Sequence, residues 1–460
     1  MEEKLISALE RAKELGASYA DIRITKSFRT RMTVINGKVK SVVPSIELRV
    51  GIRALYQGLW GFASCNSTSR EDLLETSSNA MKIARAGAST GVSPVRLAEV
   101  RSVIDRVELE EISDSRKIPL EEKQEIILES DRTARELDPR IMRTQFDYED
   151  SVVERYLLST DGQQIYEVNP FTSLRLTITA REGERIERTI GRLAASAGQE
   201  LMAYVDPMEM ARRLAMDALS LLKAKQSPSG RMPVVVDNKI SGLIALCVDL
   251  MATATLASMP ESEMGVFHKK LGEKVLPESL DITDDPSSPG LPASYRYDEE
   301  GVESRPLKVV EAGVLKGYLH SRETAYKHGT SPTGHARAPN ASFLPVPMVS
   351  NAMIGPKDYT FEELVEDVDE GIYVKGLIGA SIGRFVQCKT VMAHPIERGE
   401  VKDEVLRGPS IRLDLLKDLF SIDAVGSDYD YLPLRLTRAD EAYSVSGGGP
   451  HLRFSQLEVI

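Results

Sequence analysis

One segment of the chain, from Pro233 to Ala257, constrains the fold more than any other. It begins with a short β-branched run, Pro233 to Asp237, which predicts a buried strand. Apolar side chains then recur at helical spacing, and these are Ile240, Leu243, Ile244, Cys247, Leu250 and Met251. No His or Glu occurs between Asn238 and Thr255, so the predicted helix lacks the groups that usually build an active site.

The size and charge of the chain favour some classes of protein over others. With 460 residues, of which 42% are hydrophobic, the chain has enough apolar side chains for a large core, and its length predicts two domains or more. The 58 basic residues are outnumbered by 69 acidic ones, which gives a net charge of −11. This balance disfavours nucleic acid as the main partner, because phosphate binding needs clustered Lys and Arg.

The cysteines and the amino terminus bear on location. Cys65, Cys247 and Cys388 are far apart and odd in number, which predicts neither a disulfide framework nor a zinc knuckle and favours a cytoplasmic protein. The first 16 residues have the pattern of an acidic amphipathic helix, without the basic start and apolar run of a signal peptide. No run of 18 apolar residues occurs, so we expect no membrane span.

The first part of the chain alternates helical and strand patterns. We expect helices from about Glu3 to Leu15 and from Pro119 to Leu137, and a third that starts at a capping box of Thr68 and Glu71. The turn signals Asn36-Gly37 and Gln57-Gly58 predict two hairpins. The strands expected around them are Tyr19–Thr25, Arg29–Ile35, Lys38–Val43, Ile46–Tyr56 and Leu59–Ser64.

A turn-rich stretch from Gln226 to Gly230 is the best candidate for a domain boundary. Before it, Ile141 to Ala195 predicts an antiparallel meander with a turn at Glu182-Gly183, and Asp206-Pro207 predicts the start of a helix. After it, short strands separated by Gly, Pro and Asp predict a mostly antiparallel domain. We therefore expect an α+β protein with an amino-terminal α/β domain, residues 1–225, and a β-rich carboxy-terminal domain, residues 226–460.

Few residues are candidates for metal ligands. The chain has six His, and none occurs in HExxH or HExxxH. His328 and His335 flank the turn-rich GTSPTG, and Cys388 and His394 lie six positions apart, where they could share one strand face. Isolated loop and strand histidines are usually surface or capping residues, so these four are weak candidates for a metal site.

Two further motifs have ordinary structural interpretations. Asp281, Asp284 and Asp285 precede PSSPG, and we expect them to cap a solvated turn. The glycines of GGGPH, Gly447 to His451, lack the Lys-Ser/Thr and the helix of a phosphate loop, so a turn before the final strand is expected. No GxSxG elbow is present, and Cys247 is most simply a small core residue.

Several stretches together resemble the TldD/PmbA family, formerly described as a modulator of DNA gyrase and now regarded as a metalloprotease system. The stretches are GIRALYQGLWGFAS (51–64), MPVVVDNKISGLIA (232–245), FHKKLGEKV (267–275), DITDDPS (281–287), GVESRPLKVVEAGVLKGYLHSRETAYKHGTSPTGHAR (301–337) and SVSGGGPHLRF (444–454). The resemblance implies an amino-terminal α/β domain and a carboxy-terminal domain built on a curled antiparallel sheet. It also implies an enclosed space that holds unfolded peptide largely through its backbone.

The resemblance implies a zinc helix that this chain does not have. The family's catalytic subunit carries HExxxH on the helix after the PVVV-like strand and a third ligand, Cys, near the carboxy terminus. The matching positions here are Leu246, Cys247 and Met251, with the third near Ser427. Leu offers no lone pair, Met is a weak soft ligand and Cys cannot replace the Glu as a base, so we expect no catalytic residue and no metal at these positions.

Three interpretations stay open. The chain is the non-catalytic partner of a TldD-like subunit that holds the zinc, or a protein that binds unfolded peptide by itself, or a metalloprotease whose ligands are His328, His335, Cys388 or His394. The first implies a heterodimer, although a homodimer is also compatible with the family. None of the three requires nucleic acid or a membrane. Leu307–Val310, Gly317–His320 and Ile372–Ile378 are candidate edge strands for an extended peptide.

Overall fold

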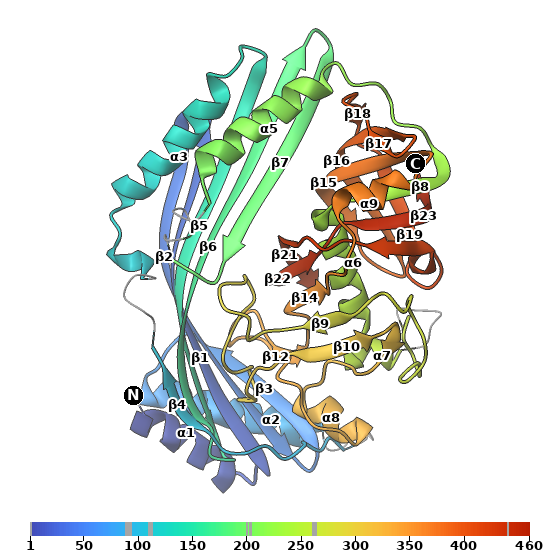
Figure 1. Ribbon diagram of the computed structural model, residues 1–460. Coiled ribbons are helices and arrows are strands. Elements are labelled where there is room, and N and C mark those ends of the chain that lie inside the picture. Colours follow the sequence, from blue (N-terminus) through green and yellow to red (C-terminus); the bar gives the residue numbers. More distant parts are fainter. Residues whose placement is uncertain are drawn as a thin grey trace.

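The structure is a computed structural model, and it describes residues 2–87, 94–108, 114–198, 201, 205–259, 265–438 and 441–460. Its amino-terminal part is one long, curved sheet with helices on one side, and its carboxy-terminal part is a set of shorter strands packed around a central helix (Figure 1). The expected α+β class is confirmed. Among the described residues, no helix is long and apolar enough to cross a membrane.

The amino-terminal sheet follows the order β3-β2-β1-β5-β6-β4, with β7 on the remaining edge of β6. All of its pairings are antiparallel except that of β4 with β6. The strands are β1 (Tyr19–Ile35), β2 (Lys38–Tyr56), β3 (Leu59–Cys65), β4 (Ile104–Val107), β5 (Ile141–Ser159), β6 (Gln164–Glu182) and β7 (Arg185–Ala195). The predicted meander from Ile141 to Ala195 is therefore present as three strands.

Both predicted hairpins are present. Asn36 and Gly37 have φ of 51° and 72°, and Gln57 and Gly58 have φ of 51° and 80°, the left-handed values that a type I′ turn requires. The strands between these turns are longer than expected. Strand β1 runs without a break through the residues predicted to form two strands, with one register shift between Thr33 and Val34.

Helices cover one face of this sheet. They are α1 (Glu2–Glu14), α2 (Arg70–Gly87), α3 (Leu120–Arg135) and α5 (Pro207–Leu221), and a 3₁₀ turn spans Ser115–Lys117. Even-numbered side chains of β1 belong to these helix-covered clusters, with Ile22 packed among α1 and α2 and Met32 among α3 and α5. Because strand side chains alternate, odd-numbered residues of β1 lie on the opposite face.

One of the helix starts predicted from the sequence is confirmed, and another is wrong. Asp206 is the N-cap of α5, and its carboxylate accepts hydrogen bonds from the backbone N–H of Met208 and Glu209. The predicted capping box of Thr68 and Glu71 is wrong by one residue. Ser69 accepts a hydrogen bond from the backbone N–H of Asp72 instead, so α2 begins one position later.

The carboxy-terminal part contains two larger sheets among the described residues, ordered β11-β10-β9-β14-β22-β21 and β15-β8-β23-β19-β16-β17. Its strands are β8 (Gly230–Val236), β9 (Ile282–Asp284), β10 (Leu307–Glu311), β11 (Val314–Leu315), β12 (Ala336–Arg337), β13 (Val346–Pro347), β14 (Asn351–Ile354), β15 (Glu370–Ser381), β16 (Phe385–Glu397), β17 (Glu400–Val401), β18 (Leu406–Arg407), β19 (Ser410–Asp414), β20 (Ile422–Val425), β21 (Asp430–Arg438), β22 (Glu441–Gly449) and β23 (Leu452–Val459). Its helices are α6 (Asn238–Met251), α7 (Ala254–Ala257), α8 (Arg322–His328) and α9 (Phe361–Glu366), with a 3₁₀ turn at Asp418–Ser421. The main core surrounds α6.

The two parts meet through buried charges. Asp21 and Arg23 lie on the face of β1 opposite the helices, and both are almost fully buried. Arg23 forms an ion pair with Glu299 at 3.3 Å, and Arg53 of β2 forms one with Glu300 at 3.0 Å. The helix-free face of the amino-terminal sheet is therefore held against the carboxy-terminal part by ion pairs.

Candidate functional site

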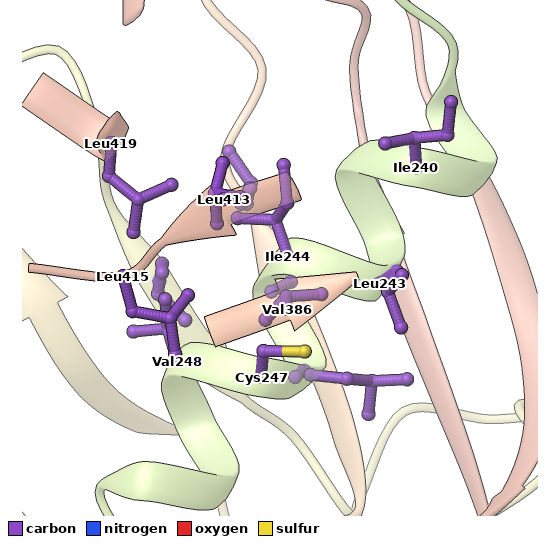
Figure 2. Packing of buried hydrophobic residues seen from close by; sticks show 14 of the residues in the cluster. Ile240, Leu243, Ile244, Cys247, Val248, Val386, Leu413, Leu415 and Leu419 are labelled. Atoms are coloured by element: carbon purple, nitrogen blue, oxygen red, sulfur yellow. The ribbon is translucent and has the colours of Figure 1, made fainter. Parts of the chain in front are cut away.

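Helix α6 follows β8 directly, as the sequence predicts. The carboxylate of Asp237 caps it by accepting hydrogen bonds from the backbone N–H of Lys239 and Ile240, both at 3.1 Å. Beyond this cap nearly every side chain is buried. Figure 2 shows Cys247 and Val248 among apolar side chains from neighbouring strands and loops.

The positions that would carry zinc ligands in a catalytic relative do not fit the metal. Leu246, Cys247 and Met251 are all fully buried in the main core. Burial raises the pKa of the Cys247 thiol far above its ordinary value, which opposes the thiolate form that zinc binds. Leu246 has no donor atom. Ser427, at the third position, is exposed, and its backbone N–H donates to the carbonyl of Tyr359 at 2.7 Å.

The four weaker metal candidates lie among different neighbours. His328 faces the ring of His320, with 5.2 Å between ring centroids, and His394 stacks on Tyr373. Cys388 is buried in β16, and His335 lies beside Asp284. Among the described residues, no group of three or more His, Cys, Asp or Glu side chains is arranged to hold a metal ion.

Asp284 contradicts the expectation that it caps a solvated turn. It is fully buried, and it accepts hydrogen bonds from the hydroxyl of Ser350 and from the backbone N–H of Ser350 and Asn351. His335 Nε2 lies 3.5 Å from its carboxylate. Only Asp285, the next residue, caps the turn through Ser287 and Ser288. A sequence signal for this burial exists, because Asp284 follows Ile282 at strand spacing and so shares its buried face.

Sequence reasoning also missed Asp249 on α6, which is fully buried beside Asp284. Burial, and then the negative charge of Asp284, raise the pKa of Asp249 well above its ordinary value. Burial alone would raise the pKa of Asp284 too, but His335 and the hydrogen bonds to its carboxylate hold it far below the usual range. Asp249 is therefore protonated near neutral pH, and the pair carries one negative charge rather than two.

A hydrogen-bonded chain of side chains lies at the start of α6. Asp428 accepts a hydrogen bond from His451 Nδ1 at 2.7 Å, and the Tyr373 hydroxyl lies 2.8 Å from His451 Nε2. Burial raises the pKa of Tyr373 well above its ordinary value, so the hydroxyl stays protonated and donates to His451. Asn238 of α6 also donates to Asp428, at 2.8 Å, so the chain joins the start of α6 to β15 and to the segment after β22. Because both ring nitrogens of His451 are occupied, it is not arranged as a free base.

The structure has open space between its two parts. A cavity of about 550 Å³ and another of about 480 Å³ lie where β7 and β21 face each other. Both are lined by Arg192 and Leu193 of β7 and by Pro433 of β21, so they form one groove, which we call the interdomain groove. Each cavity has the volume of a typical ligand site.

Both strands that flank the interdomain groove are sheet edges. Among the described strands, β7 pairs only with β6, and β21 pairs only with β22. The candidate edges chosen from the sequence fare differently. Leu307–Val310 lies in β10 between β9 and β11, so it is not an edge strand. In β15, Ile372–Val374 lies between β16 and β8, whereas the rest of Ile372–Ile378 pairs with β16 alone. Gly317–His320 forms no ladder beyond one bridge from Leu319 to Thr253.

Family models match almost the whole chain. The model described as the PmbA/TldA metallopeptidase C-terminal domain matches residues 229–460. The models for domain 1 and for the central domain of the same metallopeptidases match residues 20–84 and 113–222.

Individual relatives agree with this match. A metalloprotease of Methanocaldococcus jannaschii is 30% identical over 97% of this chain and 98% of its own length. A protein named zinc metalloprotease TldD homolog, from Saccharolobus solfataricus, is 25% identical over 98% of both chains.

Two crystal structures show the same fold. One is a Thermotoga maritima protein described as a modulator of a DNA gyrase, with a TM-score of 0.80, 23% identity and full coverage of both chains. The other is TldE from Thermococcus kodakarensis, with a TM-score of 0.77, 18% identity and 99% coverage of both chains.

Proposed function

The chain belongs to the TldD/PmbA metallopeptidase family, and from that premise we propose that it is a subunit without a catalytic metal, paired with a TldD-like subunit that holds the zinc. In this role it contributes a wall of the chamber in which unfolded peptide is cleaved. The single observation that carries the proposal concerns α6: the positions of the family's zinc-binding motif are Leu246, Cys247 and Met251 in this chain, and each is fully buried in the core.

The packing of α6 supports the proposal that this helix holds no zinc. A ligand must face a space that admits water and substrate, because a catalytic zinc keeps an open coordination position. Cys247 instead faces apolar side chains such as Val386 (Figure 2). These contacts make α6 a packing element, so peptide hydrolysis would depend on the other subunit.

The interdomain groove supports a role in holding peptide. Its two edge strands, β7 and β21, have backbone N–H and C=O groups on their unpaired sides. An extended peptide can add to such an edge through its main chain, and this kind of binding accepts many sequences. That tolerance suits an assembly that processes unfolded peptides.

Co-purification with the TldD-like protein of the same organism tests the proposal. We expect a stable complex by size-exclusion chromatography with light scattering, and hydrolysis of a fluorescent unfolded casein only when both subunits are present. The double variant Cys247→Ala/Met251→Leu is the matched control. It removes both possible donor atoms at modest packing cost, so the complex should keep its activity within about twofold.

Two results would contradict the proposal. One is hydrolysis by the isolated chain together with about one zinc per chain in elemental analysis, as a metalloprotease with relocated ligands would show. The other is a stable monomer that binds unfolded casein but forms no complex, which would indicate a stand-alone peptide-binding protein.

A further inference from the structure

We infer that the interdomain groove selects peptides that carry carboxylates, through a cluster of arginines on the helix-free face of the amino-terminal sheet and on β21. The inference rests on the proposed peptide-binding role and adds a chemical preference to it. It concerns the larger cavity, of about 550 Å³, which lies between β5, β6 and β7 on one side and β21 and β22 on the other.

The charge of this cavity is opposite to that of the chain. Its lining includes four arginines and two carboxylates, and these are Arg31, Arg175, Arg192, Arg435, Asp147 and Glu149. The whole chain has a net charge of −11. A positive lining in an acidic protein concentrates anionic ligands, because the surrounding walls keep the field inside the cleft.

One carboxylate forms ion pairs with three of the guanidinium groups around the cavity. Glu149 lies 3.2 Å from Arg29 Nε, 3.3 Å from Arg31 Nε and 2.9 Å from Arg435 Nη2. Arg29 is largely buried, and burial lowers its pKa from the ordinary value. With Asp147, the lining has two carboxylates against four arginines, so the cavity retains a positive excess that a bound anion would reduce.

The second pair of arginines has no carboxylate at all. Arg175 of β6 and Arg192 of β7 are direct cross-strand partners, an arrangement in which like charges repel. Arg192 donates hydrogen bonds to the carbonyls of Leu377 and Ile378, both at 2.8 Å, and these carbonyls are neutral. Burial, and then the charge of Arg175, lower the pKa of Arg192 to about 10. Within the described parts of the chain, neither arginine forms an ion pair.

The shape of the groove favours a peptide as the carrier of the anion. Arg175 is exposed to the cavity, and its strand neighbours Leu174 and Leu176 point the other way into the helix-covered core. Phe171 and Leu434 add apolar lining beside the guanidinium groups. A peptide that adds to the edge of β21 would place alternate side chains toward the sheet, where Arg can bind a carboxylate through two parallel hydrogen bonds.

Fluorescence anisotropy with labelled octapeptides tests the inference on the purified full-length chain. One peptide alternates Glu and Ser, a second alternates Gln and Ser, and both are amidated. A third has the Gln-Ser sequence with a free terminal carboxylate. We expect the Glu peptide to bind about tenfold more tightly than the amidated Gln peptide at low salt, and the ratio to fall as salt is added.

The informative variant is Arg175→Gln, because Arg175 is exposed and has no ion-pair partner in the described residues. It should reduce the ratio of the two affinities to about twofold, while far-UV circular dichroism stays unchanged. The control is Arg212→Gln on α5. Arg212 is exposed, pairs with Glu209 alone among the described residues, at 3.7 Å, and does not line either cavity of the groove. This control removes the same charge and should leave the ratio near tenfold.

Each outcome has a defined meaning. Equal affinities for the Glu and Gln peptides, or an equal effect of Arg212→Gln, would overturn the carboxylate preference and leave peptide binding intact. A preference shown only by the peptide with a free terminus would support the site and assign it to a terminal carboxylate. If no peptide binds, both the inference and the peptide-wall role fail, whereas assembly with a catalytic subunit is still judged by co-purification.

Discussion

At the scale of single residues, the most unusual feature is the acid pair of Asp249 and Asp284. Two adjacent buried carboxylates cannot both be charged without a large electrostatic cost. His335 and Ser350 contact Asp284 and stabilise its negative charge. The pair therefore holds one proton, and Asp249 carries it. The pair thus links α6 to β9 through an arrangement that depends on one bound proton.

Replacing Asp249 by Asn should make the protein less sensitive to high pH. The pKa of Asp249 is higher in the folded chain than in the unfolded one, so its contribution to stability is complete below about pH 3.9 and is lost as pH rises toward the folded value. Asn has the shape of the protonated acid and does not titrate. Thermal unfolding between pH 4 and pH 9 should therefore show that the free energy of unfolding of Asp249→Asn rises relative to that of the parent chain as pH increases, by up to about 1.4 kcal/mol per pH unit.

The exposed Asp358 provides the control for this experiment, because Asp358→Asn removes a carboxylate that is outside the buried pair. Its stability should follow the parent chain across the same range. Parallel curves for Asp249→Asn and the parent chain would show that Asp249 is not the proton carrier.

At the scale of elements, α6 and β22 approach each other at two glycines. A Cβ atom on Gly447 would lie 1.9 Å from the carbonyl oxygen of Gly242 and 2.8 Å from Leu246 Cγ. The glycines of the GGGPH motif therefore lie inside β22, which ends at Gly449, and only Pro450 and His451 form the expected connection before β23. Their physical role is to bring a strand against the central helix.

The variant Gly447→Ala should be strongly destabilised. The clash is with backbone atoms of α6, which cannot rotate away as a flexible side chain can, so we expect a loss of about 3 kcal/mol or more in the free energy of unfolding. Urea unfolding followed by circular dichroism gives the measurement. Gly379→Ala in β15 is the control, because its added Cβ would meet no atom within 4 Å, and its effect should stay within about 0.5 kcal/mol. Equal stability of the two variants would mean that α6 and β22 are not in close contact.

At the scale of the whole molecule, buried ion pairs join the two parts of the chain. Arg53 of β2 binds Asp21 on the neighbouring strand and Glu300 in the carboxy-terminal part. Its guanidinium lies 4.7 Å from the ring centre of Trp60, whose indole N–H donates to Glu323 of α8 at 3.0 Å. Trp60 is the single tryptophan of the chain, so its fluorescence reports directly on this contact.

Arg53→Met should cost about 3 to 5 kcal/mol in the free energy of unfolding, because it leaves the buried carboxylate of Glu300 without its ion-pair partner and leaves Asp21 with Arg23 alone, at 3.7 Å. The urea midpoint measured by Trp60 fluorescence should fall accordingly. Arg49→Met on the same strand removes a partly exposed arginine that pairs with Glu47 at 3.5 Å, and it should change stability by less than about 0.5 kcal/mol. If the two variants unfold at the same urea concentration, the buried ion pairs do not hold the two parts together.

Much of the local structure follows from short-range chemistry, which the sequence displays directly. Asn36-Gly37 determines a hairpin because it accepts left-handed backbone angles, and Asp206-Pro207 determines a helix start because its carboxylate caps free N–H groups. The strand and apolar helix from Pro233 to Ala257 were also predictable, because the spacing of apolar residues along the sequence indicates which side chains are buried and in which kind of element. The turn predicted at Glu182-Gly183 is present one position later, because Glu182 pairs with Arg185, and this shift decides that Arg175 lies opposite Arg192.

What the sequence could not determine depends on contacts between distant residues. The interdomain groove and the ion pairs across it form where β1, β5, β6 and β7 meet β21. These strands are more than two hundred positions from β21 in the sequence, and no local sequence pattern shows that they come together. The same holds for Asp284, whose partners Asp249, His335 and Ser350 come from separate segments. The sequence by itself determined that α6 has no zinc ligands at the family's positions. Only the tertiary structure decided that the helix is closed by packing and that the open, arginine-lined space lies between the two parts.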